Sequence, residues 1–254
     1  MDDLVGDDSS LHKWEILSLI INNKNIMQNR TYFSQVRKEI VPLLPSQVNR
    51  VLEIGCGSGT TLKWLKENNF VNYTIGFEIS ETAARQAMLD CDEIIIGNIE
   101  EQFDILQKFE KTIDLLLFLD VLEHLREPWK VLNICKTLLS DQGIIIASIP
   151  NVRSIKVIFP LVFYGQWNYQ NSGILDRTHL RFFTKESSVN LFRNSGYQVE
   201  KVLGNGSLSF RSAKTIKGYF LATFNLLTLN LLEQFIANQY LILAKKISTS
   251  VIRK

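Results

Sequence analysis

The sequence predicts an α/β fold of the doubly wound class, in which helices cover both faces of a mostly parallel sheet. The prediction depends on two features of residues 50–149. Short apolar runs alternate there with longer amphipathic stretches, and three of the runs are nearly continuous in isoleucine and leucine. Strands of that composition are buried on both faces, as in a parallel sheet. Their regular alternation with helical stretches is typical of doubly wound folds.

The predicted elements follow one another in a simple order. Five strands are expected at 50–54, 73–79, 93–97, 113–119 and 143–149. Helices are expected between them at 60–68, 81–90, 101–110 and 127–139, the last of which has Pro128 in its first turn, where proline is favoured. Residues 151–183 have few regular signals but many aromatic side chains. A helix at 185–194, which ends before Gly196, and strands at 197–203 and 239–245 complete the order.

Two further regions lie outside this alternation. Residues 1–10 form an acidic tail, and the helical spacing of apolar side chains over 11–45 predicts two helices, the second ending before Pro45. The stretch Tyr219–Leu232 carries no charge and is too short to span a bilayer. It predicts an apolar helix that packs on the domain, on a second subunit or on a membrane surface.

Length and composition narrow the class of protein. The chain has 254 residues, which suffice for one large α/β domain with small additions. Its formal net charge of +2 gives no reason to expect a nucleic-acid partner. Cys56, Cys91 and Cys135 show neither a disulfide pattern nor a metal-ligand spacing, and the first residues are acidic, unlike a signal peptide. We therefore expect a cytoplasmic protein without a metal site; its oligomeric state is not indicated.

A glycine-rich turn follows the first predicted strand. Gly55, Gly57 and Gly59 stand between that strand and the next helix, where glycine allows a sharp turn and a close approach to a ligand. The free N–H groups at the helix start attract negative charge. Dinucleotide-binding proteins have GxGxxG at this place. The GxGxG spacing here favours a different ligand.

Polar residues end the successive strands. Glu78 ends the second strand, Asn98 follows the third and Asp120 follows the fourth. The ligand crevice of an open parallel sheet lies outside the carboxyl ends of its strands, and an acid after the second strand can bind a ribose diol. The alternative is that polar residues merely begin solvated loops, which applies most readily to Asn98. The set as a whole predicts a nucleoside-binding crevice.

These motifs resemble those of class I S-adenosylmethionine-dependent methyltransferases, in the order VLEIGCGSGT, GFEIS, GNIE and FLDVLEHL. The resemblance implies S-adenosylmethionine as cofactor and a Rossmann-like sheet of seven strands, the last of them antiparallel. Asn98 departs mildly from the family, in which aspartate is commoner at that place. The implied cofactor-binding residues are Glu53, Gly55, Cys56, Gly57, Gly59, Glu78, Ile79, Asn98, Ile99 and Asp120.

The resemblance also divides the chain. A tail and helices over 1–45 precede a class I methyltransferase domain over 46–254, whose cofactor half is 50–150. Residues 151–183 are expected to form an acceptor-side lid, and 205–236 an apolar helical insertion. The motifs SIPNVRS and DRTHLRFFT resemble a subgroup near the ubiquinone-type O-methyltransferases, whose members often accompany polysaccharide-building enzymes. This resemblance implies a small-molecule or sugar acceptor.

Two histidines are candidates for catalysis. A hydroxyl acceptor must lose its proton, and a histidine is the usual base near neutral pH. His179, in the predicted lid, is the first candidate, although it could instead anchor the loop. His124 follows the fourth strand and could act on the acceptor or simply support the cofactor pocket.

Several functions remain open at this stage. O-methylation of a small molecule or sugar is the first, and methylation of nitrogen or carbon is the alternative within the same chemistry. A non-catalytic cofactor-binding module and an NAD-dependent oxidoreductase are alternatives of other classes. The basic side chains of the predicted lid, which suit an anionic acceptor such as a nucleotide-linked sugar, are Arg153, Lys156, Arg177 and Arg181.

Overall fold

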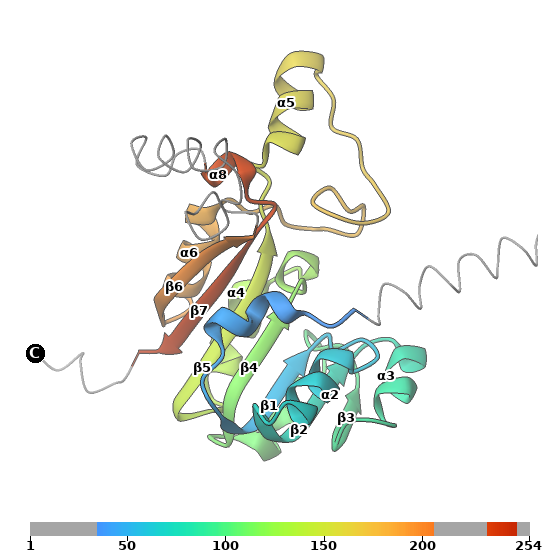
Figure 1. Ribbon diagram of the computed structural model, residues 1–254, viewed down its shortest axis with the longest axis vertical. Coiled ribbons are helices and arrows are strands. Elements are labelled where there is room, and N and C mark those ends of the chain that lie inside the picture. The colour runs from blue at the N-terminus through green and yellow to red at the C-terminus, as the bar shows by residue number, and fades with distance from the viewer. Residues whose placement is uncertain (1–34, 206–232, 248–254) are drawn as a thin grey trace, which may run out of the picture.

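The computed structural model describes residues 35–205 and 233–247 (Figure 1). Its centre is a seven-stranded sheet in the order β3-β2-β1-β4-β5-β7-β6. The strands β1 to β5 are mutually parallel, whereas β7 runs antiparallel to both β5 and β6. The predicted doubly wound sheet with an antiparallel last strand is therefore confirmed. The strands are β1 (Val48–Ile54), β2 (Val71–Glu78), β3 (Glu93–Ile96), β4 (Ile113–Leu119), β5 (Leu139–Pro150), β6 (Tyr197–Asn205) and β7 (Gln239–Lys246).

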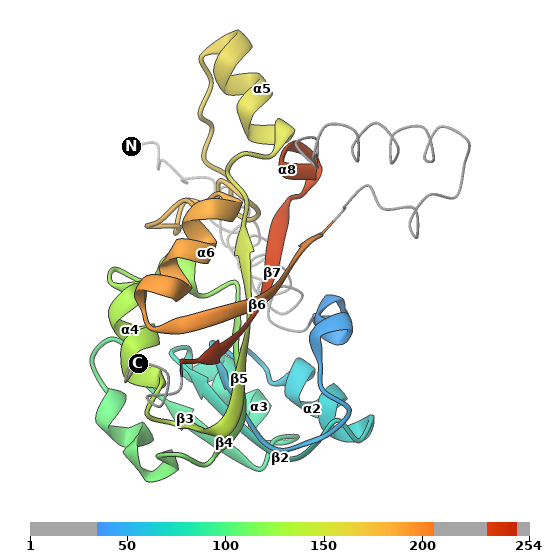
Figure 2. The ribbon, with the colours of Figure 1, turned by 90° about the vertical axis from the view of Figure 1, so that its left-hand side faces the viewer.

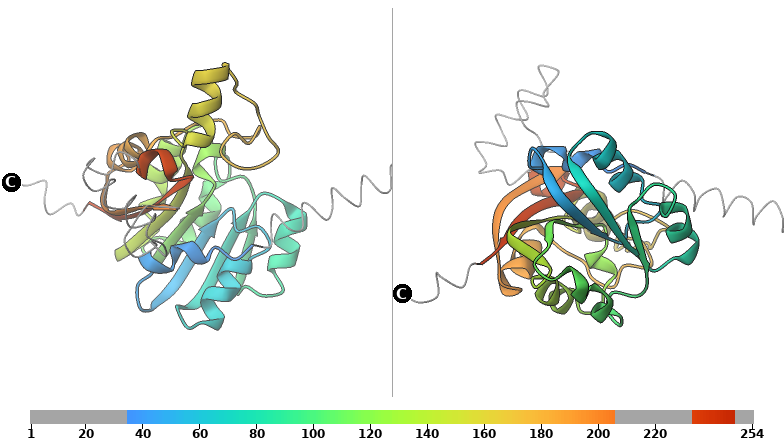
Figure 3. Two further views of the ribbon diagram at one scale, coloured as in Figure 1. Left: turned by 45° about the horizontal axis from the view of Figure 1, so that its top comes forward. Right: turned by 90° about the horizontal axis from the view of Figure 1, so that it is seen from below.

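Helices cover both faces of the sheet (Figure 2). One face packs against the 3₁₀ helix η1 (Lys38–Leu43), α2 (Thr60–Glu67) and α3 (Glu81–Ala87). The other packs against the 3₁₀ helix η2 (Phe103–Phe109), α4 (Pro128–Cys135) and α6 (Lys185–Asn194). Each face thus has its own apolar core, and the views in Figure 3 show the sheet lying between the two layers. The sheet is buried on both faces, as the isoleucine- and leucine-rich runs predict.

Two of the predicted helices are 3₁₀ helices. Ile40 and Leu43 are the buried residues of η1, and Leu106 and Phe109 are those of η2. Both pairs are three residues apart, and positions i and i+3 lie directly above one another in a helix of three residues per turn. Pro42 lies inside η1 and cannot donate a backbone hydrogen bond. In each of these short helices the two buried side chains therefore lie on one side, against the core.

Residues 151–183 contain a helix that the sequence analysis missed. This helix is α5 (Ile155–Tyr164), which extends beyond the carboxyl end of β5 (Figure 1). Its only buried residue is Val157, so it shows no periodic contrast between an apolar and a polar face. Pro160 lies inside it, where a sequence pattern indicates a helix end. The expectation of an irregular segment was wrong for these ten residues.

Other expectations fall on residues that the structure does not describe. The acidic tail, the first N-terminal helix and the stretch Tyr219–Leu232 lie outside the described residues. After the gap, the short helix α8 (Glu233–Ile236) leads into β7. Asn151 joins α8 to the end of β5, because its Nδ2 donates to the carbonyls of Gln234 and Ala237 at 2.7 and 2.8 Å. Within 35–205 and 233–247, no helix combines the length and the apolar character needed to cross a bilayer.

Candidate active site

A cleft of about 1850 Å³ lies at the carboxyl edge of the sheet. It is bordered by the glycine-rich turn after β1 and by the residues that follow β2, β3 and β4. This is where a ligand binds in an open parallel α/β sheet. Of the twelve residues singled out from the sequence, ten line this cleft: Glu53, Gly55, Cys56, Gly57, Glu78, Ile79, Asn98, Ile99, Asp120 and His124. Gly59 and His179 are the two that do not.

The glycine-rich turn depends on left-handed backbone. Gly55 and Gly59 have φ angles of +72° and +75°, which L side chains rarely adopt. A Cβ atom on Gly55 would lie 2.6 Å from Val121, and one on Gly59 would lie 2.7 Å from the Sγ of Cys91. Gly59 is the N-cap of α2, so it shapes the turn from behind. The backbone approaches the cleft closely because these positions have no side chain.

Glu78 connects this turn to the end of β2. One carboxylate oxygen accepts a hydrogen bond from the backbone N–H of Gly57 at 2.8 Å, and the other accepts from the N–H of Ser80 at 2.8 Å. The side chain is almost fully buried, with 4% of its surface exposed. Each carboxylate oxygen has two lone pairs, so both can still accept a hydrogen bond from a ligand. Glu78 therefore holds the turn in place and also borders the cleft.

Glu53 is a buried acid without a full set of partners. It is 3% exposed, and its Oε2 accepts no hydrogen bond from the described residues. Burial raises the pKa of Glu53 to about 8; the charge of Arg37 opposes this shift, whereas that of Glu78 adds to it. A buried carboxyl in this state requires either a proton or a cation beside it. A positively charged ligand group in the cleft would supply the cation.

Asp120 is held by a residue that the sequence analysis did not identify. The backbone of Asp120 is left-handed, with a φ angle of +57°. Its carboxylate lies 2.7 Å from a guanidinium nitrogen of Arg37 and accepts a hydrogen bond from the hydroxyl of Ser148 at 2.6 Å. Arg37 also donates to Ser148 at 3.1 Å. The segment before η1 thus crosses the carboxyl edge of the sheet and contributes a cation to the cleft.

Apolar and amide groups form the far side of the cleft. Ile79 is 68% exposed although it is apolar, and Ile99 is nearly buried at 7%. The Oδ1 of Asn98 accepts a hydrogen bond from the N–H of Glu100 at 3.0 Å, so one of its lone pairs is already used within the turn. A flat, partly apolar ring system with hydrogen-bonding edges would suit this wall.

A second polar group lies beside the cleft, where the 3₁₀ helix η3 (Leu122–His124) meets the loop that contains His179. The rings of His124 and His179 are 4.7 Å apart, centre to centre. His124 faces the cleft, whereas His179 is 8% exposed and borders a separate cavity of about 150 Å³. Burial lowers the pKa of His179, and the charge of His124 lowers it further. The two candidates for catalysis are therefore neighbours at different depths.

Comparison with known proteins gives the family. A family model described as a methyltransferase domain matches residues 28–202, which is more than half of the chain. The chain belongs to the methyltransferase domain family. A crystal structure of a SAM-dependent methyltransferase from Archaeoglobus fulgidus is similar in fold, with a TM-score of 0.59 and 21% identity, and the match covers 86% of this methyltransferase and 94% of that chain.

Two other relatives are similar over most of their length. A Thermotoga maritima structure described as a SAM-dependent methyltransferase and possible histamine N-methyltransferase has a TM-score of 0.57 and 18% identity, with 92% of this chain and 99% of that chain covered. An uncharacterised protein of Methanocaldococcus jannaschii is 24% identical over an alignment of 207 residues, and the match covers 76% of this chain and 79% of that protein.

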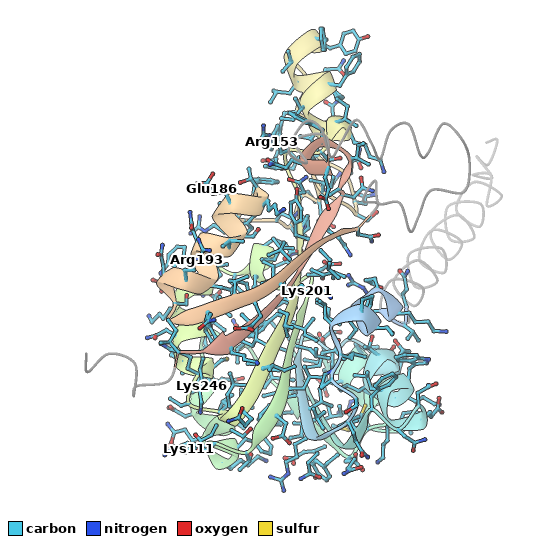
Figure 4. All side chains as sticks on the ribbon, turned by 60° about the vertical axis from the view of Figure 1, so that its left-hand side comes forward. Lys111, Arg153, Glu186, Arg193, Lys201 and Lys246 are labelled. Carbon is cyan, nitrogen blue, oxygen red and sulfur yellow. The ribbon has the colours of Figure 1, made fainter. Side chains whose placement is uncertain are left out.

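The basic residues of the predicted lid differ in their surroundings. Arg177 borders the cleft of this methyltransferase. Arg153, at the foot of α5 (Figure 4), donates to the side chain of Gln234 at 2.5 Å and lies over the ring of Phe235. Arg181 donates to the carbonyl of Arg126 at 2.6 Å and lies over Trp129, and Lys156 is exposed on α5. The four cations are close in the sequence, but in the structure they have different surroundings.

Proposed function

We propose that this methyltransferase moves the methyl group of S-adenosylmethionine to a hydroxyl group of a small molecule or a sugar. The observation that carries the proposal is the cleft itself. One crevice brings together a left-handed glycine turn, a buried acid with one carboxylate oxygen that lacks a hydrogen-bond partner, and a second buried acid at the end of β2. A nucleoside that also bears a cationic amino-acid group matches all three.

The residues of the cleft fit this cofactor in size and charge. Glu53, which lacks a partner at Oε2, provides a negative charge for the ammonium and sulfonium groups. Glu78 would accept hydrogen bonds from the ribose hydroxyls through its remaining lone pairs. Ile79 and Ile99 would contact the faces of the adenine, and Asn98 would contact its edge. The turn at Gly55 and Gly57 would allow the amino-acid end of the cofactor to approach the backbone.

S-adenosylmethionine supplies an activated methyl group, so the protein contributes mainly position and proton transfer. Alignment of two bound reactants converts a bimolecular step into an effectively unimolecular one. The acceptor oxygen must meet the methyl carbon in line with the sulfur, on the side of the cleft where His124 lies. We assign activation of the acceptor hydroxyl to the group formed by His124 and His179, of which His124 faces the cleft.

The acceptor class is supported by the loop that closes this side. Asn171, Ser172 and Arg177 border the cleft and offer hydrogen-bond donors and one cation to a hydroxylated, partly anionic acceptor. The resemblance of DRTHLRFFT to methyltransferases that accompany polysaccharide assembly favours a sugar. Methylation of nitrogen is the second candidate, favoured by the similarity to the Thermotoga maritima protein.

The proposal is tested in two steps. Isothermal titration with S-adenosylmethionine, S-adenosylhomocysteine and NAD should show binding of the first two and none of the third; binding of NAD alone would overturn it. Transfer of a labelled methyl group is then measured on matched sugars that differ in a single substituent, hydroxyl or amine. Label on the hydroxyl sugar supports O-methylation, whereas label on the amine alone indicates the second candidate.

A further inference from the structure

Three metal-ligating side chains meet beside the cleft. Glu123 and His124 belong to η3, and His179 belongs to the loop after α5. One ligand atom of each lies within 4.8 Å of those of the other two. The Nε2 of His179 is 3.9 Å from a carboxylate oxygen of Glu123. Two imidazoles and one carboxylate are a common ligand set for a divalent first-row metal ion.

Glu123 gives the second, independent observation. Its side chain is 1% exposed, and neither carboxylate oxygen has a hydrogen-bond partner among the described residues. A buried carboxyl normally has partners for both oxygens, because leaving water without them costs free energy. Its backbone carbonyl, in contrast, accepts from the N–H groups of Leu180 and Arg181 at 2.9 and 3.0 Å. The backbone is thus fixed while the carboxylate lacks a partner and lies beside the two histidines.

Both histidine rings are oriented through Nδ1. The Nδ1–H of His179 can donate to the carbonyl of Ile174 at 3.0 Å. The hydroxyl of Thr178 donates to the carboxylate of Asp176 at 2.7 Å. The hydroxyl oxygen of Thr178 can therefore accept a hydrogen bond from the Nδ1–H of His124 at 3.2 Å. In this arrangement Nε2 of each ring has a free lone pair. Metal-binding histidines are typically held in this way, with the other ring nitrogen donating to a carbonyl or a polar side chain.

We propose that Glu123, His124 and His179 bind one divalent transition-metal ion, which activates the acceptor hydroxyl of the proposed methyl transfer. The role of the metal rests on the proposed function; the binding site does not. With bonds of about 2.2 Å, three ligands spread around one ion lie about 3.6–3.8 Å apart. The ligand atoms, which now lie within 4.8 Å of one another, would therefore approach by up to about 1 Å through rotation of the side chains.

The two neighbouring acids already have partners, so we expect no more than three ligands from the described residues. Asp120 is engaged by Arg37 and Ser148, and Asp176 by Thr178. One carboxylate with two neutral imidazoles leaves a net positive charge on the bound ion and open coordination positions on the side of His124. Since nitrogen supplies two of three ligands, manganese, cobalt or zinc fits better than magnesium, which prefers oxygen.

The chemical step balances without any further reactant. The acceptor oxygen binds the ion, which lowers the pKa of the hydroxyl, and the proton passes to solvent. An oxygen lone pair then forms the new bond to the methyl carbon. The carbon–sulfur bond breaks, and its electron pair remains on sulfur as the neutral thioether of S-adenosylhomocysteine. Neither histidine acts as the base in this scheme; both are ligands that position the ion.

The test uses the full chain after removal of metals with a chelator. Mn²⁺ binding is followed by electron paramagnetic resonance and Zn²⁺ binding by calorimetry, for the wild type, Glu123→Gln, His124→Ala and Glu127→Gln. Glu127 is the matched control, because it is an exposed acid close in sequence that pairs with Lys130. We expect one ion per wild-type chain, unchanged affinity in Glu127→Gln and at least about a hundredfold weaker binding in the other two.

Thermal unfolding and S-adenosylmethionine binding are measured on the same samples. Metal should raise the unfolding temperature of the wild type but not that of Glu123→Gln. His124→Ala covers the case in which Glu123→Gln fails to fold, because His124 is only half-buried. Equal metal binding by wild type and variants, or none by either, would overturn the metal site while S-adenosylmethionine binding still upholds the proposed function. Conversely, a wild-type chain that binds metal but not S-adenosylmethionine would uphold the metal site and overturn the proposed function.

Discussion

At the scale of single residues, Glu53 is a buried acid in the wall of the cleft. Burial raises its pKa to about 8; the charge of Arg37 opposes this shift, and that of Glu78 adds to it. A carboxyl whose folded pKa is raised favours folding while it is protonated. That contribution is fully present below the unfolded pKa of about 4.5 and is lost as the pH rises toward 8.

Glu53→Gln should therefore change how stability depends on pH. The amide has almost the same shape but cannot ionise, so the free energy of unfolding of the variant should increase relative to wild type between pH 5 and pH 8, and then level off. Urea unfolding at several pH values, without cofactor, measures this. A constant difference across that range would show that Glu53 keeps an ordinary pKa in the fold.

Glu78 gives the second prediction at this scale. Glu78→Gln replaces one acceptor oxygen with an NH₂ group that faces the backbone N–H of either Gly57 or Ser80, so one of these hydrogen bonds is lost. S-adenosylmethionine should bind at least about tenfold more weakly, since a charge-assisted hydrogen bond contributes about 1.5–3 kcal/mol. Glu81→Gln, on the exposed start of α3, is the control. An unchanged dissociation constant in a folded Glu78→Gln protein would remove Glu78 from the cofactor site.

At the scale of elements, the turn between β1 and α2 can be compared with the end of α5. Gly59 and Gly165 both have left-handed backbone, with φ angles of +75° and +63°. A Cβ at Gly59 would meet Cys91 and Ala87 at 2.7 and 2.9 Å, whereas one at Gly165 would have no neighbour within 4 Å. A substitution at Gly165 therefore tests backbone strain alone, whereas one at Gly59 tests strain and crowding together.

Gly165→Ala should cost about 1–2 kcal/mol of unfolding free energy, which is the strain of a left-handed alanine. Gly59→Ala should cost that amount and a further 1–3 kcal/mol or so for overpacking. It should also weaken S-adenosylmethionine binding, because the displaced turn includes Gly57. Urea unfolding and calorimetry on both variants provide the comparison. Equal losses of stability would mean that α2 and α3 move apart to admit the methyl group.

At this scale, the predicted elements can be compared with those of the structure. The five parallel strands were predicted from short apolar runs, three of them nearly continuous, because a strand buried on both faces has a composition that needs no tertiary information. Arg37 could not be predicted as part of the cleft, because its contacts to Asp120 and Ser148 join distant parts of the chain. The exposed apolar surface of α5, with Phe163 67% exposed, gave no periodic signal. The proximity of Glu123 to His179 could not be predicted for the same reason, because these residues are distant in the sequence.

At the scale of the whole molecule, the cleft draws on separate parts of the chain. The segment before η1, the ends of four parallel strands and the loop after α5 all border it. Arg37 and Asp120 connect the first of these to the fourth strand. Distant parts of the chain therefore meet at this edge of the sheet, where the five buried acidic and histidine side chains of the described residues lie: Glu53, Glu78, Glu123, Asp176 and His179.

A ligand that fills this edge should stabilise the whole fold. A ligand that binds only the native state adds about 2.7 kcal/mol at a hundred times its dissociation constant. For a chain of this length, each kcal/mol raises the unfolding temperature by about 2–4 °C, so S-adenosylmethionine at that concentration should raise it by roughly 5–11 °C. S-adenosylhomocysteine should act in the same way, because the groups that Glu78, Asn98 and the glycine turn are proposed to bind are shared by both molecules. NAD at equal concentration is the control and should shift it by less than about 1 °C. A shift with S-adenosylhomocysteine but none with S-adenosylmethionine would mean that the sulfonium meets a repulsive charge, and would contradict the placing of Glu53 beside it.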